Sequence, residues 1–157
     1  MCIIESFGFL IRHYHQAAAR YVQYYQNFLK KNLAMNDNIR NFLLKICPEI
    51  LEGEFSQKSI IEYIQTVKIM EIEFTGNGCF INLDSENSNF EMEIINKMHN
   101  QNELNFDGLE LINKDKNLLC EIRILIIQQK IKLIEIWNKL GSDFTEIPSE
   151  YELNKNW

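Results

Sequence analysis

Closely spaced carboxylates are the residues of this chain whose types and spacing could do chemistry. Glu71 and Glu73 form one Glu-x-Glu pair, Glu91 and Glu93 form a second, and Asp84 lies between the pairs. Carboxylate oxygens are the ligands that hard divalent cations prefer, so Glu71, Glu73 and Asp84 could surround the ion of a metal-dependent nuclease. The same alternation of charged and apolar residues is typical of the solvent-exposed face of a strand. We favour this second interpretation and expect no metal and no cofactor.

Other catalytic signatures are missing from the sequence. The glycines of residues 76–78 are not followed by Lys-Ser/Thr, so they do not form a phosphate-binding loop. His13 and His15 are two residues apart, which places them on different faces of a helix and makes a poor metal pair. No Gly-x-Ser-x-Gly elbow and no Cys-His arrangement of a nucleophilic enzyme occurs. We therefore expect that the protein is not an enzyme.

The elements that must position the carboxylates begin with a hairpin. Residues 71–84 alternate apolar and polar side chains on both sides of Gly-Asn-Gly, the pattern of two antiparallel strands joined by a tight turn. The turn at residues 76–78 allows two registers, in which Phe74 faces either Ile81 or Cys79. Both registers place the same apolar residues on one face: Ile72, Phe74, Cys79, Ile81 and Leu83. The opposite face is predicted to be acidic surface: Glu71, Glu73, Thr75, Phe80, Asn82 and Asp84.

Helices are predicted before the hairpin. Apolar residues, many of them aromatic, recur every three or four positions over residues 7–33, which predicts a long amphipathic helix. This helix could pack on a sheet or form a coiled coil, so a self-associating scaffold is an alternative function. Two shorter helices follow, one over about residues 37–46 and one over residues 60–67. Pro48 either interrupts the first of them or opens another short turn.

Strands dominate the predicted structure after the hairpin. Residues 107–112 fit a strand, whereas residues 90–98 fit either a strand or a short helix. The Ile- and Leu-rich run over residues 118–137 is long enough for one helix. Its many β-branched residues favour two strands instead, about 119–127 and 131–137.

A single α+β domain is expected for residues 1–157. Its N-terminal helical layer (residues 1–66) packs on an antiparallel β-sheet of four to six strands (residues 67–140), and an irregular tail follows (residues 141–157). No stretch is long and apolar enough to cross a bilayer, and the first residues lack the basic segment of a secretory signal. The four cysteines are far apart. We expect a cytoplasmic protein with reduced thiols and no membrane partner.

Negative charge is concentrated in the second half of the chain. Residues 1–66 hold seven Lys/Arg and six Asp/Glu, a balance of +1, whereas residues 67–157 hold nine Lys/Arg and sixteen Asp/Glu, a balance of −7. This distribution argues against a nucleic-acid partner and is compatible with a basic protein. A surface that is only soluble could carry the same charge.

Two segments carry a resemblance to a known family. Residues 73–82, with the sequence EFTGNGCFIN, form a strand–Thr-Gly-x-Gly–aromatic hairpin. Residues 124–136, followed by Gly141 and Pro148, form a late pair of strands with an acidic, Pro-containing tail; Ile147 stands where an aromatic residue is expected before the proline. In both segments the chain resembles small bacterial immunity proteins of contact-dependent growth inhibition and related polymorphic toxin systems.

The resemblance implies a protein that acts by binding. Such immunity proteins neutralise a cognate toxin, commonly a nuclease with a basic substrate cleft, by docking an acidic surface on it. Complementary charge would speed the encounter, and a few buried anchors would set the affinity. The candidate toxin-binding residues lie near the hairpin and in the tail: Asp84, Glu86, Glu91, Glu93, Asp143, Glu146 and Glu150. The identity of the toxin and the oligomeric state of the chain are left open.

Overall fold

The computed structural model of the chain describes residues 23, 24, 26, 27, 30, 35–85, 89–98 and 101–156. Its contacts divide the chain into two compact units, Met1–Asn38 and Ile39–Trp157. The described residues of the smaller unit are helical. Most of the predicted helix over residues 7–33, including His13 and His15, lies outside the described residues. The single domain and the coiled coil therefore stay predictions.

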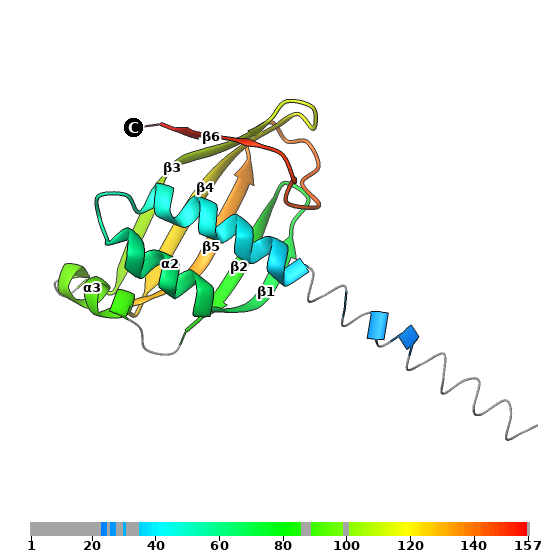
Figure 1. Cartoon of the computed structure of the whole chain (residues 1–157). Helices are drawn as coiled ribbons and strands as arrows, with labels where there is room; N and C mark the ends of the chain where they lie inside the picture. The colour runs from blue at the N-terminus through cyan, green and yellow to red at the C-terminus, as the bar shows by residue number, and fades with distance from the viewer. Residues whose placement is uncertain are drawn as a thin grey trace, which may run out of the picture. The chain divides into compact units, whose positions relative to one another are not determined.

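The larger unit contains a six-stranded sheet with the strand order β1-β2-β5-β4-β3-β6, in which all neighbouring strands are antiparallel (Figure 1). The strands are β1 Lys68–Phe74, β2 Gly78–Asp84, β3 Glu103–Asn113, β4 Leu118–Ile127, β5 Lys130–Asn138 and β6 Glu152–Lys155. Its helices cover residues 39–50, α2 (Gln57–Thr66) and α3 (Asn89–Met98), and they lie on one side of the sheet (Figure 1). The predicted α+β class is confirmed. Among the described residues, no helix combines the length and the apolar character needed to cross a membrane.

Every second side chain of the strands points toward these helices and contributes to the core between the helices and the sheet. Every second residue of β4 is fully or almost fully buried, while the residues between them are half-buried. Tyr63 of α2 and Phe90 of α3 are buried with their ring centroids 5.0 Å apart. Phe55 meets Phe90 at 5.1 Å in an edge-to-face arrangement. Each such buried side chain stabilises the fold by roughly 1.5–3 kcal/mol, so the layer of helices is held firmly on the sheet.

The predicted hairpin forms, in one of its two expected registers. Phe74 pairs with Cys79, and a bulge between Ile69 and Glu71 shifts the register farther along the strands. The predicted apolar face is the face that lies against the core. Gly78 is required where β2 approaches β5, since a Cβ atom there would lie 2.1 Å from the carbonyl oxygen of Ile136.

Three segments show where burial decides the structure. The interruption predicted at Pro48 does not occur, because the helix continues to residue 50. Proline costs about 3 kcal/mol inside a helix, and burial of Ile46, Cys47 and Ile50 around it offsets that cost. The ambiguous segment over residues 90–98 is the helix α3, whereas the run over residues 118–137 is two strands as predicted.

The tail is not irregular throughout, and that part of the prediction was wrong. Residues 152–155 form β6, which pairs with β3 through Leu111 and Leu153. Leu153 also packs against the core, so an apolar contact distant in sequence gives this short segment its strand conformation. The expectation of reduced, buried thiols is confirmed for the cysteines that the structure describes: Cys47, Cys79 and Cys120.

Candidate functional site

The predicted toxin-binding carboxylates lie in two groups at opposite ends of the sheet. Gly78, which begins β2, pairs with Trp137 near the end of β5. The end of β2 and the end of β5 therefore lie at opposite ends of the strands. The first group follows β2 and consists of Asp84, Glu86, Glu91 and Glu93, of which Glu86 lies outside the described residues. The second group follows β5 and consists of Asp143, Glu146 and Glu150.

Asp84 and Glu91 in the first group are occupied by contacts within the fold. Asp84 Oδ1 accepts a hydrogen bond from Lys132 Nζ at 2.7 Å, and this bond lowers the pKa of the carboxyl group. Glu91 is only 6% exposed, and its Oε1 accepts a hydrogen bond from Ser85 Oγ at 2.5 Å. A partner could reach Asp84 at the cost of competing with Lys132, whereas Glu91 is largely shielded from a partner.

Glu93 serves as an N-terminal cap for a helix other than its own. Its carboxylate accepts hydrogen bonds from the backbone N–H of Ser56, at 2.8 Å, and from Ser59 Oγ. Ser56 is the N-cap of α2, where backbone N–H groups lack helical partners and the helix dipole favours negative charge. The position of Glu93 on α3 thus ties the two helices together.

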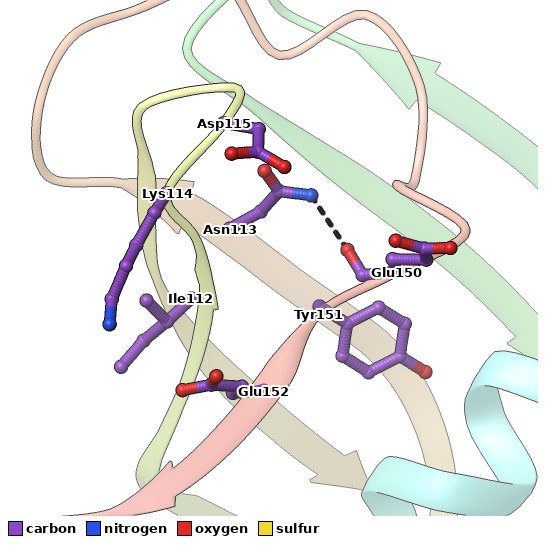
Figure 2. A pocket seen from close by; sticks show the side chains of 7 residues that line it. All are labelled: Ile112, Asn113, Lys114, Asp115, Glu150, Tyr151 and Glu152. Atoms are coloured by element: carbon purple, nitrogen blue, oxygen red, sulfur yellow. Dashed lines mark hydrogen bonds between the residues drawn. The ribbon is translucent and has the colours of Figure 1, made fainter.

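The second group borders a groove of about 370 Å³ between the β3–β4 turn and the segment that enters β6 (Figure 2). The groove is lined by Ile112, Asn113, Lys114, Asp115, Glu150, Tyr151 and Glu152. Of the predicted site residues that the structure describes, Glu150 alone lines it. Asp143 is exposed on the neighbouring loop, and Glu146 pairs with Lys116 at 2.5 Å, which lowers the pKa of Glu146.

Asn113 fixes the two walls of the groove relative to each other. Its Nδ2 donates a hydrogen bond to the backbone oxygen of Glu150 at 2.7 Å, drawn as the dashed line in Figure 2. Its Oδ1 accepts a hydrogen bond from the backbone N–H of Lys116 at 2.8 Å. Asn117 completes the turn in the left-handed region, with φ 53°, a conformation that asparagine tolerates better than most residues. One side chain thus holds the turn and the segment before β6 in place.

Tyr151 forms an aromatic wall on the helix side of the groove. Its ring meets Phe42 edge-on, with the centroids 5.7 Å apart, and Lys45 Nζ lies 5.4 Å from the ring centroid. Partial burial raises the pKa of the Tyr151 hydroxyl. These two contacts hold the Tyr151 ring in position at the groove.

The groove carries excess negative charge that the fold does not neutralise. Asp115, Glu150 and Glu152 are exposed, and no described basic side chain lies within ion-pair distance of them. Lys114 is the one basic residue in the lining. Such an arrangement attracts a lysine or arginine side chain of a partner and repels phosphate.

The carboxylates proposed for a nuclease metal do not converge. Glu71 lies opposite Asn82, and Glu73 lies opposite Phe80. Asp84, at the far end of β2, is bound to Lys132. Over the part of the chain that the structure describes, no three His, Cys, Asp or Glu residues are placed to hold a metal ion. The geometry gives the nuclease alternative no support.

Sequence reasoning missed part of the groove. Asp115 lies between two lysines in a turn, and Glu152 lies in the segment that was expected to be irregular. The turn chemistry of residues 113–117 was a usable signal, but only the pairing of β6 with β3 brings the turn beside the tail.

Comparisons of the chain with protein families, with curated proteins and with solved structures found no match. The functional argument therefore depends on the groove, on the charge distribution and on the sequence resemblance.

Proposed function

We propose that this protein is an immunity protein that neutralises a cognate bacterial toxin by binding it in the cytoplasm, without turnover of a substrate. The observation that carries the proposal is the groove at the β3–β4 turn, where Asp115, Glu150 and Glu152 have no basic partner among the residues that the structure describes. The resemblance to immunity proteins of contact-dependent growth inhibition supplies the functional class. The groove supplies a docking site for a basic protein.

The partner is a toxin domain with a basic surface, such as the substrate cleft of a nuclease. Each exposed ion pair with the groove would contribute only about 0–1 kcal/mol. Several unpaired carboxylates on one side of the molecule would nevertheless steer a basic partner and raise its association rate by roughly 10-fold or more at low salt. Affinity would come from buried contacts around the wall that Tyr151 forms.

Co-expression with the toxin encoded beside this chain tests the proposal. The toxin alone is expected to arrest growth, and co-expression of this protein is expected to restore it. Binding kinetics should show an association rate that falls steeply as salt rises. The informative variant removes three groove charges at once: Asp115→Asn, Glu150→Gln and Glu152→Gln.

A matched control removes three charges from exposed carboxylates that lie elsewhere on the described surface: Glu71→Gln, Glu73→Gln and Glu103→Gln. The groove variant should slow association by about 10-fold while the control changes it less than about 2-fold. Equal effects of the two triple variants would show that net charge alone matters and that the groove is not the site. Cleavage of nucleic acid by the purified chain would contradict the functional class itself.

A further inference from the structure

The face of the sheet that points away from the helices is open in the larger unit. Its side chains alternate with those of the core, and no described element of residues 39–157 covers them (Figure 1). Several are apolar and half-buried: Phe80, Leu119, Leu125, Ile127 and Leu133. Trp137 is 49% exposed and lines a shallow hollow of about 230 Å³ with Glu121, Arg123 and Glu135. Aromatic and arginine side chains on an uncovered apolar face are typical of a protein interface.

The charges at the centre of this face are paired, unlike those of the groove. Arg123 Nη1 lies 3.5 Å from Glu135, and Lys132 Nζ lies 2.7 Å from Asp84. Lys139 pairs with Glu110 at 2.8 Å and with Glu121 at 3.5 Å. This face therefore offers both signs of charge in close alternation. A basic partner gains little from such a surface, whereas a second copy of the same surface can match it.

The strand register shows how two copies would match. β5 and β4 are the central pair of the sheet, and on the open face Arg123 lies opposite Glu135 and Leu125 opposite Leu133. A two-fold axis that runs between these strands and parallel to them places β4 of one copy over β5 of the other. Each Arg123 then faces Glu135 of the second copy, and each Leu125 faces Leu133. Cross-strand pairs within one copy become complementary pairs across the interface.

Arg123 has hydrogen-bonding capacity left for such a contact. Its nearest carboxylate oxygens, from Glu135 and Glu121, are 3.5 and 3.9 Å away, which is long for charge-assisted hydrogen bonds. Its Nε is buried and has no hydrogen-bond partner. A glutamate from a second copy would supply a closer acceptor for the Arg123 guanidinium than these two carboxylates do.

The area is sufficient for a specific dimer. The four central strands lie about 4.8 Å apart and offer about nine residues of length each, at about 3.3 Å per residue, so their face measures roughly 600 Å². Specific interfaces bury about 600–1,000 Å² per partner. The open face is therefore at the lower end of the range for a stable complex.

We propose that the chain forms a symmetric dimer through the open face of its sheet, with the two-fold axis between β4 and β5. This dimer is separate from the proposed toxin site. The interface is centred on β4 and β5, whereas the groove lies at the end of β3 beside β6. Either proposal can fail without the other.

Analytical ultracentrifugation of the full chain across a dilution series tests the dimer. The wild type should sediment as a dimer that dissociates on dilution. Trp137→Glu should raise the dissociation constant by about 10-fold or more, because it places a buried charge in the interface. Met92→Ser is the control, since Met92 is 59% exposed on α3 and should leave the equilibrium unchanged.

A charge-exchange experiment distinguishes contacts between copies from contacts within one copy. Arg123→Glu places two glutamates at the matching positions of both copies, and Glu135→Arg places two arginines there, so each variant alone should be monomeric. A mixture of the two variants should form a heterodimer, because each glutamate then faces an arginine. A wild type that is monomeric at all concentrations overturns the proposal, as does a mixture that stays monomeric or a dimer that Trp137→Glu does not weaken. Circular dichroism of each variant establishes that it is folded.

Discussion

Replacing Glu93 by alanine separates a role in the fold from a role in toxin binding. The sequence suggested that Glu93 contacts the partner, whereas in the structure its carboxylate accepts hydrogen bonds from Ser56 N–H and Ser59 Oγ at the start of α2. Glu93→Ala removes both bonds and the negative charge beside the N-terminus of the helix. We expect a less stable protein whose folded fraction still binds the toxin.

The magnitude follows from the two bonds and their surroundings. A hydrogen bond to a charged group contributes about 1.5–3 kcal/mol, and a carboxylate near a helix N-terminus adds about 0.3–1 kcal/mol. The contact with Ser56 is exposed, so water replaces much of it when the carboxylate is removed. We therefore expect a loss of about 1.5–2 kcal/mol in the free energy of unfolding. For a unit of this size the midpoint of thermal unfolding should fall by roughly 6–8 °C.

Urea unfolding monitored by circular dichroism measures this loss, and a double-mutant cycle assigns it. Glu93→Ala, Ser59→Ala and the double variant should reveal a coupling energy of about 0.5–1 kcal/mol. Glu62→Ala is the control, because Glu62 lies exposed on α2 with Lys58 at 3.8 Å, and such a pair contributes less than about 0.5 kcal/mol. A stability unchanged by Glu93→Ala, or a coupling energy of zero, would refute the capping role. Loss of toxin binding at full stability would restore Glu93 as a contact residue.

Three further predictions concern Gly78, Glu110 and the described cysteines. Gly78→Ala should destabilise the protein by about 2–3 kcal/mol in urea unfolding, since its Cβ would meet the Ile136 carbonyl. The hydrogen bond from Lys139 lowers the pKa of Glu110 in the folded protein. The ionised Glu110 carboxylate therefore stabilises the fold fully at a pH above the ordinary carboxyl pKa, and this stabilisation is lost as the pH falls through the folded-state pKa. In the Glu110→Gln variant, the urea midpoint of unfolding should therefore fall less between neutral and acidic pH than it does in the wild type. Burial also raises the pKa of the described thiols, so mass spectrometry should find them alkylated only after unfolding: Cys47, Cys79 and Cys120.

The alternation of apolar and polar residues in the sequence predicted most of the strands correctly. Alternation over residues 71–84 and over residues 118–137 predicted the strands, because a strand with one buried face needs apolar residues at every second position. The path of the helix beyond Pro48 and the existence of β6 depend on burial against residues distant in sequence. α3 was ambiguous for the same reason, since Phe90 and Ile94 satisfy either period until the core they face is known.

The candidate site was predicted less well, because the strand order and register decide which carboxylates lie close together in space. The predicted toxin-binding residues were one set near the hairpin and one set in the tail, and antiparallel pairing places these two sets at opposite ends of the sheet. Asp115 was not among the predicted site residues. Only the register of β3 with β6 shows that Asp115, Glu150 and Glu152 line one groove.

Net charge alone is a poor guide to which surface receives a basic partner. Glu110, Glu121 and Glu135 contribute to the excess of acidic residues in the second half of the chain, but each already pairs with a lysine or arginine on the open face. A partner must break those pairs before it gains from them, so the open face behaves as a balanced surface and suits a second copy. Carboxylates without a partner keep their full attraction, and within the described part of the chain Glu150 and Glu152 of the groove have no basic partner. The pairing within the fold thus supports the proposal that the two surfaces have different partners, although they belong to one sheet.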